Sequence, residues 1–160
     1  MKKLIYLVSF TILIGGCANN HKLISIQKSI YGNWFTKEQK RVDSKTIINI
    51  TRKEQFFKNG KLISSKWFEV KDSSGKNLGE YYITKEFIYK KEPKYIKAKF
   101  IRCQTGITKP LKDDFGYQAL SNACKKSLGS HKTTIKAYKI IGNKLILNSN
   151  NKKIIYTKED

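Results

Sequence analysis

Apolar and polar residues alternate along most of this chain in short runs. From Tyr95 to Cys103, for example, Ile96, Ala98 and Phe100 alternate with lysines. A period of two places successive side chains on opposite faces of a strand, so one face packs and the other contacts water. Similar runs, separated by turn residues, predict further strands at 46–51, 61–70, 79–90, 133–141, 144–148 and 152–158.

Turn residues mark the ends of these runs. Asn59-Gly60 follows Phe56-Phe57-Lys58, and its tolerance of positive φ predicts a type I′ hairpin turn. Pro93 lacks a backbone N–H and therefore suits a turn or an edge strand. Seven or eight short strands at this spacing predict a mainly β fold, either a small antiparallel β-barrel or a β-sandwich.

One segment has helical spacing instead. Its apolar positions are Tyr117, Leu120, Cys124 and Leu128. Asp113 and Asp114 open the segment, and lysines followed by Gly129 close it. Acids at the start, bases in the last turn and a closing glycine predict one late α-helix at about 113–128.

The strongest apolar run lies at the N-terminus. Lys2 and Lys3 precede an apolar core at 4–14, shorter than the roughly 20 residues of a membrane-spanning helix and typical of a secretion signal. The residues Ile14-Gly15-Gly16-Cys17 resemble the lipobox of bacterial lipoproteins. This resemblance implies a diacylglyceryl thioether on Cys17, cleavage before it, and acylation of the new amino terminus with a chain such as palmitate.

The same resemblance implies how the chain is divided and where in the cell it is located. Residues 1–16 would be the signal peptide, 17–25 the lipidated N-terminus and tether, and 26–160 a single β-rich domain. Several acyl chains anchor a protein durably to a membrane. Ala18 is not the aspartate that retains such lipoproteins at the inner membrane. We therefore expect a lipid anchor in the cell outer membrane, with the periplasmic or surface face left open.

The charge is strongly positive, with 33 basic and 12 acidic residues and a net charge of +21. Without Lys2 and Lys3, 31 basic residues remain and the net charge is +19. Such a field attracts anionic partners, here anionic lipid, lipopolysaccharide or an envelope protein. The alternative is that the lysine excess reflects amino-acid composition and not a binding surface. Only three of the basic residues are Arg, and lysine lacks the bidentate guanidinium group used in specific phosphate sites. The predicted anionic-ligand patch comprises Lys90, Lys91, Lys94, Lys97 and Lys99.

With Cys17 modified, two cysteines remain. Cys103 and Cys124 form an even pair in an oxidising compartment, which predicts a disulfide between the Tyr95–Cys103 strand and the helix. A catalytic or metal-binding pair is the alternative, but neither has a C-x-x-C neighbour, and both histidines, His21 and His131, are distant in sequence.

A second resemblance involves Ile30-Tyr31-Gly32-Asn33-Trp34-Phe35. This Gly-x-Trp resembles the first block of lipocalin-like barrels, which implies that Gly32 permits a tight start of the barrel and that Trp34 plugs its closed end. The run at 46–61 is also similar to the early hairpin of small lipocalin-like lipoproteins. Lipocalins have an arginine near the last strand that stacks on the tryptophan. Here that region offers only Lys152, Lys153 and Lys158, and Trp34 as an ordinary core residue is the alternative.

We find no catalytic, cofactor-binding or metal-binding constellation in the sequence, and nucleic acid is not an expected partner of an exported chain. The sequence therefore predicts a non-enzymatic, lipid-anchored envelope protein that binds an apolar or anionic ligand. The alternative is a protein-interaction module, such as a surface adhesin, an inhibitor or an immunity protein.

Overall fold

The computed structural model describes residues 29–128, 133–149 and 152–159. It is mainly β, with eight antiparallel strands in a closed barrel and one helix after the fifth strand. The elements are β1 (Gly32–Arg41), β2 (Thr46–Phe56), β3 (Lys61–Asp72), β4 (Asn77–Lys91), β5 (Tyr95–Lys109), α1 (Tyr117–Ser127), β6 (Thr133–Ile141), β7 (Lys144–Ser149) and β8 (Lys152–Lys158). The barrel with one late helix is confirmed, and the sandwich alternative is wrong.

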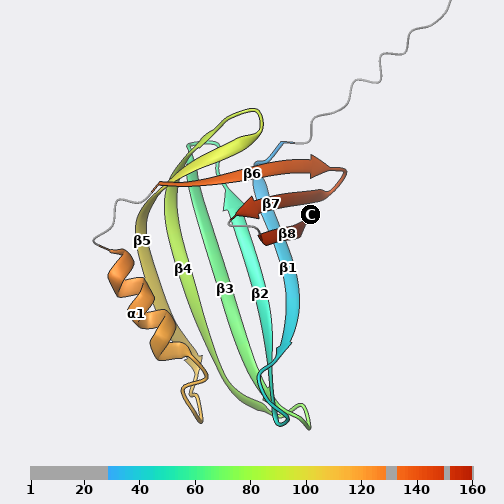
Figure 1. Ribbon diagram of the computed structural model, residues 1–160, viewed down its shortest axis with the longest axis vertical. Coiled ribbons are helices and arrows are strands. Elements are labelled where there is room, and N and C mark those ends of the chain that lie inside the picture. The colour runs from blue at the N-terminus through green and yellow to red at the C-terminus, as the bar shows by residue number, and fades with distance from the viewer. Residues whose placement is uncertain (1–28, 129–132, 150–151, 160) are drawn as a thin grey trace, which may run out of the picture.

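Differences in strand length divide the barrel into two parts (Figure 1). The short strands β6, β7 and β8 cross the upper part of the long strands. β8 pairs with β1 only at Trp34 and Phe35, and β6 pairs with β5 only from Tyr95 to Lys99. Below these pairs β1 to β5 continue as a curved sheet, with α1 packed beside β5. The upper part is therefore closed by strands, whereas the lower part has a concave face flanked by the helix.

Trp34 lies in the core of the upper part and is fully buried. Its indole N–H donates to the carbonyl oxygen of Ile30 at 2.7 Å, and Lys158 Nζ lies 5.5 Å from the ring centre. A lysine, and not the arginine of lipocalins, thus lies over the Trp34 ring. Gly32 has a φ of +112°, which disfavours any side chain at this position. These contacts make Gly32 and Trp34 architectural residues of the closed part.

The helix begins at Tyr117, so the predicted start near Asp113 is wrong by one turn. Asp114 lies before the helix, where its carboxylate accepts a hydrogen bond from the backbone N–H of Gln118 at 2.8 Å. A carboxylate that satisfies a first-turn N–H must precede the helix it caps, which is why the acidic pair marks the approach to α1. Leu128 follows the helix and is 55% exposed, so the buried stripe ends at Cys124.

The turn between β2 and β3 also differs from the prediction. Gly60 has a φ of +81°, but Asn59 does not have a positive φ, as a type I′ turn would require. The N–H of Gly60 donates to the carbonyl oxygen of Phe57, and the Asn59 side chain accepts from the N–H of Lys61 at 3.1 Å. This is the alternative hairpin solution, a type I turn followed by a left-handed glycine.

The predicted disulfide between Cys103 and Cys124 is present, with the two Cα atoms 5.6 Å apart. It joins β5 to α1. Tyr117 and Leu120 of α1 pack against the lower core, which includes Ile48, Ile50 and Val70. The disulfide and this packing together hold the helix against the concave face.

Candidate functional site

The predicted lysine patch, here called the outer strip, lies on the β4–β5 hairpin. Lys90 pairs directly with Lys97, and Lys99 pairs with the exposed Ile88. These side chains share the outer face of the barrel because they alternate with buried residues such as Ile96. They border a shallow depression of about 260 Å³ lined by Ile88, Tyr89, Lys90, Lys97, Lys99 and Thr133. Register therefore brings three of the five predicted lysines together.

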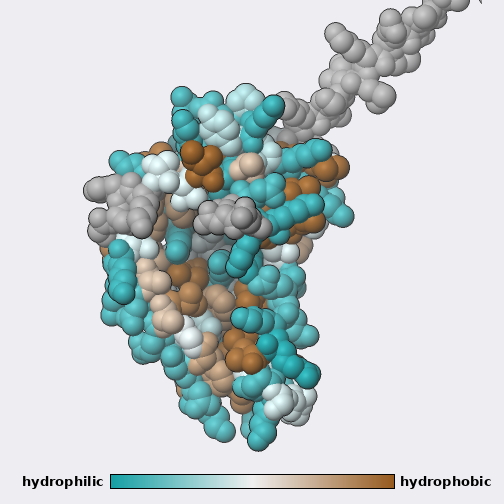
Figure 2. Space-filling model, viewed as in Figure 1, coloured by the Kyte–Doolittle hydropathy of each residue, from teal (hydrophilic) through white to brown (hydrophobic). Residues whose placement is uncertain are grey.

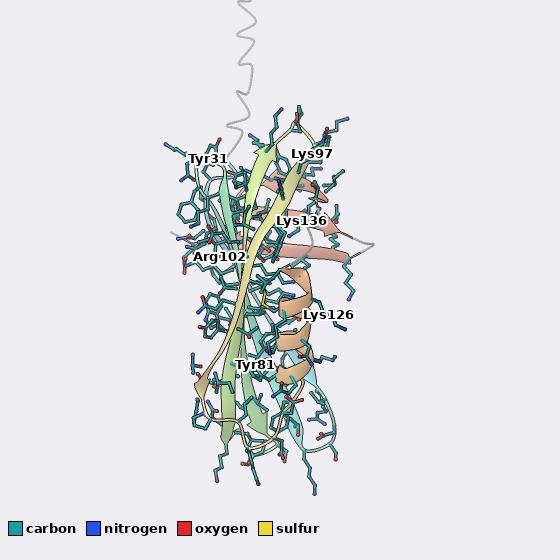
Figure 3. All side chains as sticks on the ribbon, turned by 90° about the vertical axis from the view of Figure 1, so that its left-hand side faces the viewer. Tyr31, Tyr81, Lys97, Arg102, Lys126 and Lys136 are labelled. Carbon is teal, nitrogen blue, oxygen red and sulfur yellow. A yellow bond between two sulfur atoms is a disulfide. The ribbon has the colours of Figure 1, made fainter. Side chains whose placement is uncertain are left out.

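The other two lysines of the outer strip lie at the upper rim. Lys94 is exposed in the hairpin turn, and Lys91 pairs with Ile96, whose side chain faces inward. Lys90 Nζ is 3.7 Å from a carboxylate oxygen of Glu92, a contact open to solvent. Figure 3 shows Lys97 near the same end of the molecule. The outer strip is thus a cationic surface that wraps over one end of the barrel.

A second group of charges lies on the inner face, and the sequence reasoning missed it. Glu54, Ser64 and Lys85 are direct neighbours across β2, β3 and β4. Two residues lower, Arg52 of β2 pairs with Lys66 of β3. Both rows have the same strand parity as the buried core residues above and below them, so they face the interior. They form two polar rows across the inside of the sheet.

Apolar rows enclose these polar rows. Above them, Phe56, Leu62 and Phe87 are neighbours across β2 to β4, and all three are buried. Below them, Phe68 stacks on Tyr81 with ring centres 4.6 Å apart. The inner face therefore changes from apolar to charged and back to apolar along its length.

Glu54 is the centre of the polar rows and is only 4% exposed. Its Oε1 accepts hydrogen bonds from the Ser64 hydroxyl at 2.9 Å and the Tyr156 hydroxyl at 3.2 Å. Lys136 reaches it from β6 across the barrel, with Nζ 3.8 Å from Oε1. Arg52 pairs with Glu38 of β1, whose side chain is 47% exposed. Within the described residues, Glu54 Oε2 and Arg52 Nε have no hydrogen-bond partner.

We call Arg52, Lys66, Lys85 and Lys136 the inner cationic cluster. Burial lowers the pKa of Lys66, and the charges of Arg52, Lys85 and Lys136 lower it further. Burial likewise lowers the pKa of Lys85, with a second contribution from Lys136. These causes place Lys66 and Lys85 in one group with Arg52 and Lys136. Burial also raises the pKa of Tyr156, so its hydroxyl stays protonated as a donor to Glu54.

A signal for this cluster exists in the sequence. The predicted β2 strand ended at 51, but the observed strand runs to Phe56. Extending the alternation of Ile48 and Ile50 by two steps places Arg52 and Glu54 on the same face, with the apolar Phe56 beyond them. Charged residues that follow the same every-second-residue alternation as the core residues of a strand indicate a polar site on its inner face.

The concave face below the cluster is apolar and partly open. Figure 2 shows apolar side chains gathered on the lower half between α1 and β1. Tyr81 lies beside α1 in Figure 3, and its ring meets that of Tyr117 edge-on at 5.7 Å. Ile107, the neighbour of Tyr81 on β5, is 49% exposed. The helix thus covers only part of this surface.

Other sequence predictions fall outside the described residues. These are the signal peptide at 1–16, the lipidation site Cys17, the whole 17–25 tether region and both histidines, His21 and His131. Among the residues that the structure describes, there is no group of three or more His, Cys, Asp or Glu side chains that could hold a metal ion. In the same residues, no helix has the length and apolar character needed to span a membrane.

Comparisons with known proteins assign no family to this chain. The chain matches no family model, and no curated protein matches it significantly.

Proposed function

We propose that this chain is a non-enzymatic, lipid-anchored protein of the cell outer membrane that binds anionic envelope material through the outer strip. The observation that supports this best is the direct pairing of Lys90 with Lys97 beside Lys99, on one exposed surface with Ile88. Clustered lysines near a membrane attract anionic head groups by about 1 kcal/mol each. An exposed isoleucine among them adds a small apolar contact.

The position of the outer strip supports membrane contact. β1 starts at Gly32 at the same end of the barrel as the β4–β5 turn (Figure 1). If Cys17 carries the lipid, the 13 Cα–Cα steps from Cys17 to Ile30 reach at most about 45 Å when extended. The anchored end of the barrel is then the lysine-rich end. Anionic lipid or lipopolysaccharide phosphates lie within its reach.

The test is vesicle binding by the full chain carrying Cys17→Ser, so that attached acyl chains do not dominate partitioning. Reversing Lys90, Lys97 and Lys99 to Glu should weaken binding to vesicles with about one third anionic lipid by roughly 100-fold at low salt. The matched control reverses the exposed Lys37, Lys45 and Lys76 near the other end, which changes the net charge equally. Equal losses in both variants would show a general charge effect and contradict the assignment to the outer strip.

A protein-interaction module, such as an adhesin, inhibitor or immunity protein, is the second candidate. The edge of β1 favours it, because from Thr36 to Arg41 this strand pairs only with β2 among the described residues. A free edge can accept a strand from a partner. Cross-linking in intact envelopes should then recover one protein in stoichiometric amount. Recovery of lipid alone would reject this candidate.

A further inference from the structure

The inner cationic cluster has more positive than negative charge. Lys136 contacts the buried carboxylate of Glu54, and Arg52 contacts the half-exposed Glu38. Even with both carboxylates ionised, two positive charges remain without a counter-charge among these contacts. Burying cations in excess is costly unless an anion joins them. The cluster is therefore electrostatically incomplete.

An unpaired donor on Arg52 points to the same conclusion. Arg52 Nε meets no hydrogen-bond partner in the described part of the chain, although the side chain is only 15% exposed. Buried polar groups are nearly always paired, so an unpaired donor on a cation calls for an acceptor from outside the chain. The cluster is also distinct from the outer strip, which lies on the opposite face of β4 and β5.

The surroundings of the cluster define the shape of its ligand. Below Arg52 and Lys66, the inner face presents the partly buried Phe68 and the buried Ile50 and Tyr81, and it continues to the buried Ile48 and Val70. From the level of Arg52 to that of Thr46 is six residues, which is about 20 Å of strand. An apolar surface of this length next to a cluster of cations matches a molecule with an acidic head and one hydrocarbon chain.

We propose that the inner cationic cluster binds the acidic head group of a single-chain amphiphile whose hydrocarbon chain lies on the concave apolar face. Lys66 and Lys85 supply the charge, and Arg52 Nε donates to an oxygen of the head group. Glu54 and Tyr156 hold Lys136 in place. The apolar chain extends from the cluster toward the lower end, between β1 and α1. The same chemistry is shared by a fatty acid carboxylate and by the phosphate of a lysophosphatidic acid.

The experiment uses the full chain with Cys17→Ser, so that no attached acyl chain competes, and measures binding by calorimetric titration. Palmitic acid is compared with methyl palmitate, and palmitoyl lysophosphatidic acid with monopalmitoylglycerol. Each pair has the same chain but differs in head-group charge. The charged members should bind at least 10-fold more tightly than the uncharged ones. Whichever acid gives the larger ratio identifies the head group as carboxylate or phosphate.

Substitutions then test whether Lys66 and Lys85 cause the preference for the acid over the ester. Lys66→Met combined with Lys85→Met should reduce acid binding to the level of the ester and leave ester binding unchanged. The matched control, Lys37→Met with Lys139→Met, removes the same charge from exposed positions on the outer face and should retain the 10-fold preference. Lys66→Arg with Lys85→Arg should also retain it, which tests charge separately from side-chain shape.

Three outcomes would overturn the site. These are equal binding of acid and ester to the starting protein, no binding of either, and an acid preference that persists in the double Met variant. Because vesicle binding by the outer strip is measured with different variants, either proposal can fail without the other.

Discussion

The outer strip and the inner cationic cluster contain the same residue type in opposite surroundings. Lys90, Lys97 and Lys99 keep their ammonium groups in water, where a positive charge has little effect on folding. Lys66 and Lys85 lie inside the barrel, and burial lowers the pKa of both. A lysine on the inner face therefore opposes folding, whereas one on the outer face is nearly neutral.

This difference separates exposed lysines, which amino-acid composition can explain, from buried lysines, which indicate a function. A lysine-rich composition adds exposed lysines at little cost to stability, so the proposal for the outer strip rests on the pairing of Lys90 with Lys97 beside Lys99 and not on the number of lysines. Inward lysines in two adjacent rows are not expected by composition, since apolar residues would stabilise the same positions. Proteins retain such destabilising groups mainly at binding or catalytic sites.

Glu54→Gln should have the largest effect on stability. It removes the buried carboxylate that contacts Lys136 and leaves the inner cationic cluster facing only Glu38. Breaking a buried ion pair in this way costs roughly 3–5 kcal/mol, so we expect the free energy of unfolding in urea to fall by about 3 kcal/mol or more. Glu92→Gln on the outer face, which loses the contact with Lys90, is the control and should change it by less than about 0.5 kcal/mol. Equal effects would remove the distinction between the two faces.

Local sequence patterns predicted most of the fold. Alternation in runs such as Tyr95 to Cys103 identified seven strands, because burial of one face imposes a period of two. Closure into a barrel could not be predicted in the same way. It depends on β1 pairing with β8 at Trp34 and Phe35, residues more than 120 positions from their partners. A local pattern contains no information about such a contact.

The candidate sites show the same limit. The outer strip was predicted because its lysines are adjacent in sequence on one hairpin. The inner cationic cluster joins Arg52, Lys66, Lys85 and Lys136 from four different strands, so only strand register brings them together. Lys66 between Leu62 and Val70, and Lys85 between Ile83 and Phe87, have the parity of core residues. Both residues lie within the predicted strands 61–70 and 79–90, so their parity was visible in the sequence, whereas Arg52 lay beyond the predicted end of β2 at 51.

The disulfide gives the second prediction, because it holds α1 beside the inner rows at Cys103, the neighbour of Lys85. Replacing both Cys103 and Cys124 by Ser should lower the free energy of unfolding by about 3 kcal/mol, since the pair closes a loop of 21 residues. Amide hydrogen exchange should increase most in α1 and little in the closed upper part around Trp34. Uniformly faster exchange in both parts would show that the two halves of the barrel unfold together and would contradict their separation.

Lys66→Met should have the smallest effect and the opposite sign. Removing a partly buried cation should raise the free energy of unfolding at neutral pH by on the order of 1 kcal/mol, whereas Lys97→Met on the outer strip should change it by less than about 0.5 kcal/mol.

The pH dependence of this stabilisation tests whether the charge of Lys66 is its cause. Below the lowered pKa of Lys66 both folded and unfolded chains are protonated, and the full penalty is present. Between that pKa and 10.5 the unfolded chain binds more protons, so the original protein gains stability as pH rises and the advantage of Lys66→Met should shrink. An advantage that is constant up to pH 10.5 would mean that methionine acts through packing and that the charge of Lys66 has no cost.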